Sequence, residues 1–73
     1  MKARVTVSLK QTVLDPQGQA IHNALSGLGH AGVSLVRQGK VFEMEVDPDT
    51  DLDSIARYVL TNPVIEDYRI EYL

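Results

Sequence analysis

The residues from Lys2 to Lys10 alternate strictly between polar and apolar side chains, and this pattern limits the fold more than any other feature of the chain. The apolar positions share one face of an extended strand: Ala3, Val5, Val7 and Leu9. Alternation with a period of two, carried by β-branched residues, predicts a strand that buries one face and exposes the other. The fold must therefore contain a sheet with one covered face and one open face.

Two later segments predict amphipathic helices. The first begins at Asp15-Pro16, because aspartate is a preferred N-cap and proline suits the first helical position; Gly27 and Gly29 end it. Its apolar residues follow helical spacing: Ile21, Ala24, Leu25 and Leu28. The second helix follows the acidic turn 47–51, where Thr50 or Asp51 can cap it, and ends before Asn62-Pro63. Its apolar residues are Leu52, Ile55, Ala56, Val59 and Leu60. Each helix therefore has one apolar stripe to bury.

Residues 33–46 predict a β-hairpin in which Gln38-Gly39 is a two-residue turn and Gly39 supplies a positive φ. In this register Val36 faces Val41, Leu35 faces Phe42 and Val33 faces Met44. The apolar pattern and the turn agree on the pairing. Val36 and Val41 then form an apolar pair on the otherwise polar face of the sheet, where another copy of the chain could cover them.

A final strand completes the expected order βαββαβ in a single domain, residues 1–73; Tyr68, Ile70 and Tyr72 occupy one of its faces. The class is α+β. Short loops and right-handed crossovers favour a ferredoxin-like split βαβ fold, an antiparallel sheet of order 4-1-3-2 with two helices on one face. A 73-residue chain without cysteine has no disulfide, and domains below roughly 70–80 residues usually need such a support. We therefore expect association with other chains.

The composition argues against several classes of function. A net charge of −3 provides no electrostatic footprint for nucleic acid, and the expected open face carries no aromatic platform for bases. No apolar run approaches the ~20 residues of a membrane helix. The basic start, Met1 to Arg4, leads into the alternation, so we expect no signal peptide and a cytoplasmic location.

No set of residues has the spacing of a catalytic or metal site. Asp47, Asp49 and Asp51 resemble the start of a calcium loop, but neither register has the required glycine and glutamate. His22 and His30 have no partner with which to form a relay. Without cysteine there is no thiolate nucleophile and no sulfur-bound zinc. We expect no catalytic, cofactor-binding or metal-binding residue in this chain.

Four segments together resemble the PurS proteins: Val7-Ser8-Leu9-Lys10, Val13-Leu14-Asp15-Pro16-Gln17-Gly18, Val36-Arg37-Gln38-Gly39-Lys40 and Asn62-Pro63-Val64-Ile65-Glu66-Asp67-Tyr68. PurS is the small subunit of phosphoribosylformylglycinamidine synthase, which works in purine biosynthesis. The similarity covers essentially the whole chain. It departs from the family pattern at Tyr58 to Thr61, and the loop at Gln11-Thr12 lacks a Pro-Gly type pair; neither departure touches the two most specific segments.

The resemblance implies a non-catalytic assembly subunit of an ATP-dependent amidotransferase ligase. In that family a glutaminase subunit, PurQ, releases ammonia from glutamine. A larger synthetase subunit, PurL, uses ATP and magnesium to activate formylglycinamide ribonucleotide and accepts the ammonia. PurS forms a dimer or a higher homo-oligomer such as a tetramer and is thought to bridge the two. The implied partners are further copies of this chain, a PurL-like subunit and a PurQ-like subunit, and the implied cofactors belong to the synthetase.

Two signatures are interpreted as subunit contacts. Helix capping requires neither Gln17 nor Gly18, and glycine in a first turn costs ~0.5–1 kcal/mol relative to alanine; Glu66-Asp67 is a poor opening for a strand. The interface candidates are Lys10, Asp15, Gln17, Gly18, Val36, Val41, Asn62, Pro63, Glu66 and Asp67. The alternative is a regulatory module of the ACT type, which shares the βαββαβ order, dimerises and binds small molecules.

Overall fold

The computed structural model describes all 73 residues, and three strands form one antiparallel sheet. β1 (Lys2–Leu9) lies at its centre, between β2 (Gly39–Glu45) and β3 (Glu66–Tyr72). The strand predicted from the alternation is therefore confirmed, as are the strand expected at the end of the chain and the α+β class. The strands predicted as third and fourth flank the first, as expected.

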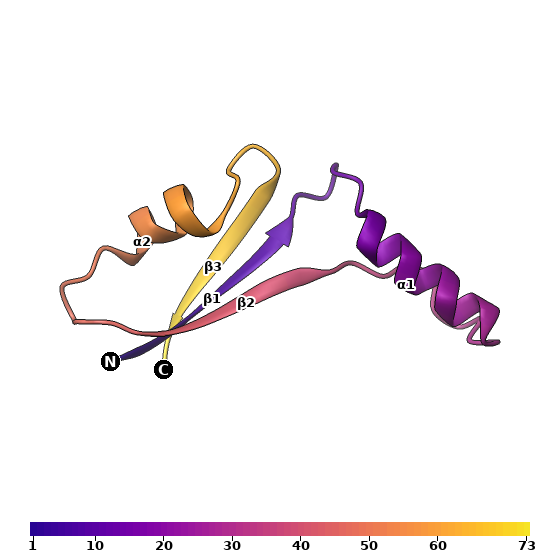
Figure 1. Cartoon of the computed structure of the whole chain (residues 1–73), viewed down its shortest axis with the longest axis horizontal. Coiled ribbons are helices and arrows are strands. Elements are labelled where there is room, and N and C mark those ends of the chain that lie inside the picture. The colour runs from indigo at the N-terminus through magenta and orange to yellow at the C-terminus, as the bar shows by residue number, and fades with distance from the viewer.

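One face of this sheet is covered by α2 (Leu52–Ile55) and by η1 (Ala56–Leu60), a π-helical turn that continues α2 (Figure 1). The core between them consists of five buried residues: Ala3, Val5, Val7, Leu52 and Ala56. Partly buried side chains surround it: Phe42, Met44, Val46, Ile55, Leu60, Tyr68 and Ile70. The apolar face predicted for β1 is buried at Ala3, Val5 and Val7. On the predicted face of β3, Tyr68 and Ile70 pack against this core, whereas Tyr72 is 58% exposed.

The start of α2 is fixed by Asp51. Its carboxylate accepts a hydrogen bond from the backbone amide of Ser54 at 3.2 Å and another from the Ser54 hydroxyl at 2.8 Å. These bonds, the hydroxyl first, hold the pKa of Asp51 below its usual value. The interpretation of the acidic turn as a helix cap is therefore confirmed for Asp51.

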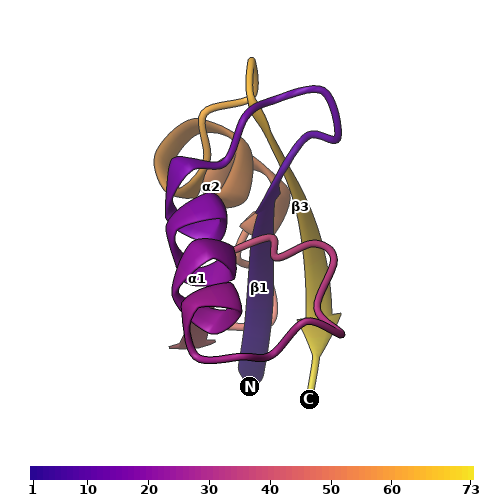
Figure 2. The same cartoon turned by 90° about the vertical axis from the view of Figure 1, so that its right-hand side faces the viewer.

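α1 (Pro16–Gly27) lies beyond the end of the sheet and not over its face (Figure 1). Residues 28–38 return beside it without regular secondary structure, and Figure 2 shows this pair end-on. We call residues 16–38 the arm. The longest dimension of the molecule is 49 Å and its radius of gyration is 15.4 Å, against about 11 Å for a compact chain of this length. The arm makes the molecule long and thin.

The predicted hairpin does not form within the chain. Residues 33–38 are not a strand; they continue from β2 along the arm (Figure 1). Gly39 has no positive φ, and Gly29 is the only residue that has one, at 91°. Gly39 instead pairs with Ser8 at the end of the ladder between β1 and β2. The prediction of a second strand at residues 33–38, and with it a four-stranded sheet, is therefore wrong for this chain alone, as is the prediction of both helices over one sheet face.

Candidate functional site

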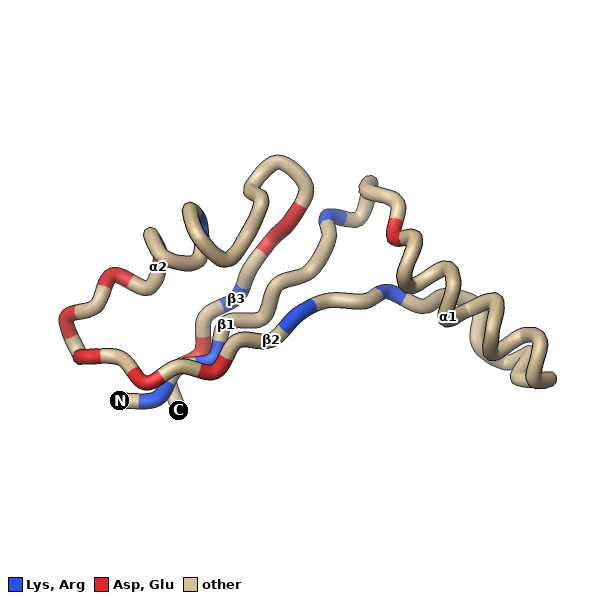
Figure 3. The backbone as a smooth tube through the Cα atoms, viewed as in Figure 1, with Lys and Arg blue, Asp and Glu red and all other residues tan.

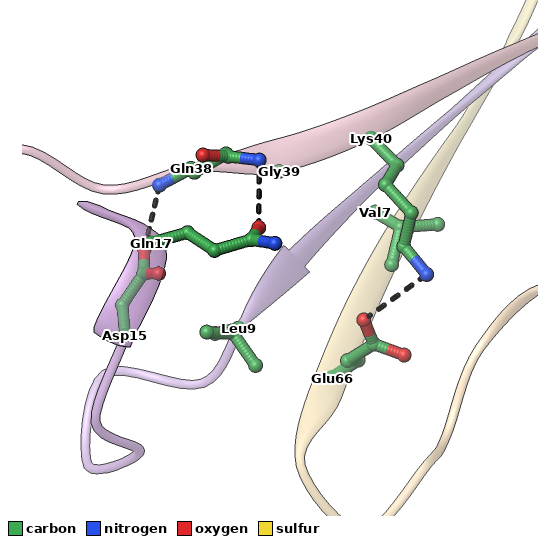
Figure 4. A pocket seen from close by; sticks show the side chains of 8 residues that line it. All are labelled: Val7, Leu9, Asp15, Gln17, Gln38, Gly39, Lys40 and Glu66. Atoms are coloured by element: carbon green, nitrogen blue, oxygen red, sulfur yellow. Dashed lines mark hydrogen bonds and ion pairs between the residues drawn. The ribbon is translucent and has the colours of Figure 1, made fainter. Parts of the chain in front are cut away.

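Three of the interface candidates, Asp15, Gln17 and Glu66, meet where the arm leaves the sheet, a region that we call the arm root. A cavity of about 300 Å³ lies there between the sheet and the arm (Figure 4). Its lining residues are Val7, Leu9, Asp15, Gln17, Gln38, Gly39, Lys40 and Glu66. The cavity brings together residues from β1, α1, β2 and β3, so the arm root joins segments that are far apart in the sequence.

Asp15 uses its two carboxylate oxygens for different purposes. Oδ1 accepts a hydrogen bond from the Gly18 amide at 2.9 Å, which caps α1, and Oδ2 accepts one from the Gln38 amide at 2.7 Å. The amide of Gln38, and then that of Gly18, hold the pKa of this carboxyl below its usual value. The predicted cap is confirmed; the bond to Gln38, which links α1 to the start of β2, was not predicted.

Two further contacts at the arm root were missed by the sequence analysis. The Gln38 side chain donates a hydrogen bond to the Gln17 side chain at 2.7 Å. The Arg37 guanidinium donates to the carbonyl oxygens of Val13 and Lys10, both at 2.9 Å. One signal could have revealed Arg37, because the predicted hairpin places it opposite Lys40, and like charges directly opposite each other are unfavourable.

Gly18 is buried because its own chain approaches it. A β-carbon at this position would overlap the carbonyl oxygen of Val36, which lies on the returning segment of the arm. Gly18 is therefore explained by the close approach of this chain's own backbone, without the subunit contact inferred for it from the sequence. Val36 and Val41, expected to face each other, are apart: Val36 lies against Gly18, and Val41 lies opposite Thr6 on the open face of the sheet.

The second signature forms a tight loop before β3. Asn62 accepts a hydrogen bond from the Val64 amide through its side chain, at 3.1 Å, and donates its own amide to the Glu66 carboxylate, at 2.7 Å. Its carbonyl accepts the amides of Ile65 and Glu66. The loop is thus internally bonded and leaves Val64 exposed.

Charged contacts attach this loop to its neighbours. Lys10 pairs with Asp67 at 2.7 Å, and Lys40 lies 3.7 Å from Glu66, whose side chain is only 13% exposed. A surface hollow next to them has as its lining residues Lys10, Arg57, Thr61, Pro63, Glu66, Asp67 and Tyr68. Lys10, Pro63, Glu66 and Asp67 are therefore brought together, as their common assignment to an interface requires.

The open face of the sheet carries cross-strand charge pairs. Arg4 lies 3.9 Å from Glu43, and Lys2 is the register partner of Glu45. The arm differs from this face, because residues 16–36 include no lysine, arginine, aspartate or glutamate (Figure 3). Its apolar side chains are accessible: Ile21 is 42% exposed, Leu35 72% and Leu28 76%. Residues 16–36 of the arm are therefore an uncharged and largely uncovered surface.

No cluster of three or more His, Asp or Glu side chains could hold a metal ion, and no helix is long and apolar enough to span a membrane.

Comparison with known proteins gives a consistent result. Residues 2–73 match the family described as PurS: Phosphoribosylformylglycinamidine (FGAM) synthase. The PurS subunit of Mycobacterium leprae is 54% identical over 72 residues, which are 94% of this chain and 91% of that protein. The PurS structure from Bacillus subtilis has a TM-score of 0.87 at 45% identity and covers 96% of this chain and 94% of its own. A chain in the structure of PurLQS from Thermotoga maritima has a TM-score of 0.84 at 27% identity, covering 99% and 95%.

Proposed function

Because the chain belongs to the PurS family of phosphoribosylformylglycinamidine synthase subunits, we propose that it is the non-catalytic assembly subunit that holds the glutaminase and the synthetase together while ammonia passes between them. The synthase is a glutamine amidotransferase ligase of purine biosynthesis. On this proposal the partners are a PurL-like synthetase and a PurQ-like glutaminase in the cytoplasm. ATP and magnesium act in the synthetase, and this chain binds neither.

The observation that supports an assembly role is the surface that the chain leaves uncovered. Its accessible surface is 5321 Å², whereas the scaling law for compact monomers gives about 4,500 Å² at this mass. The difference, about 800 Å² per chain, is the area that each partner contributes to a protein interface of standard size. The lack of charge in residues 16–36 agrees with this, since charged residues are depleted in the centres of interfaces.

A second copy of this chain fits the arm. The hairpin register of residues 33–46 is symmetric about the bond between Gln38 and Gly39, so the same pairs form when two chains cross there on a two-fold axis. Val36 of one copy would then face Val41 of the other. β2 offers its outer edge for this pairing, because only its inner edge is bonded, to β1.

This pairing of the arm of one copy with β2 of the other, which we call arm exchange, also covers the apolar surfaces of both copies. Val33 and Leu35 of one arm would lie next to Phe42 and Met44 of the other copy, on the side of the sheet that α2 covers. The α1 helix of that arm would lie beside α2 of the other copy. Each half of the dimer then acquires four strands and two helices on one face, which is the split βαβ arrangement that the sequence predicts for one chain.

The arm exchange can be tested by cross-linking, because the chain has no cysteine. In a double Val36→Cys, Val41→Cys variant the two thiols of one extended chain lie about 16 Å apart, beyond the ~7 Å limit between the α-carbons of a disulfide. We expect mild oxidation to produce a covalent dimer on a non-reducing gel, and each single variant to produce far less. If the double variant stays monomeric on the gel and the wild-type chain sediments as a monomer, arm exchange is wrong.

The bridging role needs the whole complex. We expect glutamine-dependent synthesis by the synthetase and glutaminase to require this chain, and ammonia-dependent synthesis to proceed without it. Full glutamine-dependent activity in its absence would contradict the proposal.

The loop that contains Asn62 and Asp67 is the candidate contact with these larger subunits. Asp67 is the appropriate position for charge reversal, since its side chain is 63% exposed, whereas Glu66 also fixes the loop through Asn62. Asp67→Lys should weaken capture of the larger subunits. Glu45→Lys, a charge reversal at the other end of the sheet, where the side chain is 75% exposed, should have no effect.

The family match favours this assignment over the ACT-type regulatory module. Calorimetry with amino acids and nucleotides distinguishes the two, since specific binding of a small molecule by the isolated chain would support the regulatory module.

A further inference from the structure

The straight path of the chain through Gln38 and Gly39 is held by contacts outside β2. The Gln38 amide donates to Asp15 at 2.7 Å, and the Arg37 guanidinium donates to the carbonyls of Val13 and Lys10. All three acceptors lie in the loop that joins β1 to α1. We call these three hydrogen bonds the latch. They fix the returning segment of the arm to the same loop from which the arm starts.

The sequence across the latch is also suited to a closed turn. Gly39 is free to adopt a positive φ, although it does not have one here, and Gln38-Gly39 then makes a two-residue hairpin turn. The pairs of that closed hairpin are the pairs of the exchanged dimer, because both registers are symmetric about the bond between residues 38 and 39. The same residue pairs therefore form within one chain or between two chains, and the side-chain pattern favours neither arrangement.

We propose that the latch makes this choice: it keeps the arm extended, so that residues 33–38 pair with a second copy and not with their own β2. The proposal rests on the arm exchange described above and adds a conformational device to it. Asp15 is the central residue, because the oxygen that bonds Gln38 is not the one that caps α1. Loss of the latch leaves a chain that can fold back on itself and withdraw its arm from the interface.

The two roles of Asp15 can be separated by substitution. Asparagine remains a good N-cap, so Asp15→Asn keeps an oxygen for the Gly18 amide but presents an amide group to the Gln38 N–H in place of the second oxygen. Arg37→Gln removes the other half of the latch and does not touch the cap. Asp51→Asn is the matched control, since Asp51 caps α2 in the same way and lies away from the arm root.

The test places these substitutions in the Val36→Cys, Val41→Cys background. In a two-residue hairpin these positions form the first non-hydrogen-bonded pair, about 4.5 Å apart between α-carbons, so a closed chain forms an intrachain disulfide. After oxidation at low micromolar concentration, a non-reducing gel and the intact mass separate the covalent dimer from the oxidised monomer. Circular dichroism of each variant verifies that it is folded.

With the latch intact we expect mainly covalent dimer. Asp15→Asn should raise the ratio of intrachain to interchain disulfide by about tenfold, the effect of one lost hydrogen bond to a charged group. Arg37→Gln, which loses two such bonds, should raise the ratio by at least as much. Asp51→Asn should leave that ratio unchanged. An unchanged ratio in both latch variants, or loss of the interchain bond without gain of the intrachain bond, would overturn the latch. Absence of the interchain bond with the latch intact would instead refute the arm exchange, so the two failures are distinct.

Discussion

Gly18 lies so close to the carbonyl oxygen of Val36 that a β-carbon on residue 18 would overlap that oxygen. The contact joins the first turn of α1 to the returning segment of the arm, next to the bond between Asp15 and Gln38. His22 makes a second link further along, where its Nε2 lies 2.9 Å from the carbonyl oxygen of Val33. The arm is therefore a packed unit of its own, and its packing requires that residue 18 has no side chain.

Gly18→Ala should loosen this unit. Forcing a methyl group against a backbone oxygen costs typically 1–3 kcal/mol, which exceeds the gain of ~0.5–1 kcal/mol from alanine in a helix. We expect a lower urea midpoint and weaker dimerisation. Gly27→Ala is the matched control in the same helix, since nothing lies within 4 Å of its β-carbon position, and it should stabilise the protein. Equal stabilisation by both substitutions would contradict the close approach.

The small core predicts a large effect at Leu52, which is 2% exposed and is the largest fully buried side chain. Leu52→Ala should lower the free energy of unfolding by 2–5 kcal/mol, a substantial part of the total for a domain of this size. Val59, 75% exposed on η1, provides the control, and Val59→Ala should change the free energy of unfolding by less than about 0.5 kcal/mol. Chemical denaturation at one fixed protein concentration compares them.

The lowered pKa values of Asp15 and Asp51 predict how stability depends on acid. A carboxyl with a folded-state pKa below its unfolded value of about 3.9 stabilises the fold fully above that value. Its contribution is lost as the pH falls through the folded-state pKa. The free energy of unfolding should therefore be level between pH 7 and 5 with respect to these groups and should fall below pH 4. Asp15→Asn and Asp51→Asn should each make that fall shallower in titrations followed by circular dichroism.

Tyr68 predicts how stability changes at alkaline pH. Its hydroxyl donates to Asp53, and this bond, followed by burial, raises the pKa of the phenol. Because the folded-state pKa of Tyr68 is raised, the phenol contributes fully to the free energy of unfolding below its unfolded-state pKa of about 10. The contribution is lost as the pH rises through the folded-state value. Tyr68→Phe should remove this alkaline loss of stability, whereas Tyr72→Phe, at an exposed position of the same strand, should retain it. Denaturation between pH 8 and 11 measures both.

The helices and strands that depend on neighbouring residues are all predicted from the sequence. The alternation in β1, the cap and proline at the start of α1, the Asp51 cap of α2 and the inward face of β3 are all present. Each depends on side chains within a few residues of one another, and their physical preferences are strong. The predicted hairpin fails because a pattern of apolar residues specifies which side chains share a face, but not whether the chain turns or continues between them.

In the candidate site, too, the local contacts are predictable from the sequence and the long-range contacts are not. The cap by Asp15 follows from residues 15–18 alone. Its bond to Gln38 and the clamp by Arg37 on Lys10 join residues more than twenty positions apart, and their geometry depends on where the arm leaves the sheet. The ion pair between Lys10 and Asp67 likewise requires the neighbouring positions of β1 and β3. Long-range contacts of this kind have no signature in the spacing of residues.

Only seven of the 73 residues are buried, and this small core would make the stability of the protein depend on its concentration. If the proposed arm exchange covers the remaining apolar area with another copy, the protein has no fixed melting temperature, because its unfolding equilibrium includes the encounter of two chains. Dilution then acts as a denaturant, and the amount of chain present in the cell sets the fraction that is folded. Binding to the larger subunits would counteract this loss on dilution, because a partner that binds only the folded chain shifts the unfolding equilibrium toward it.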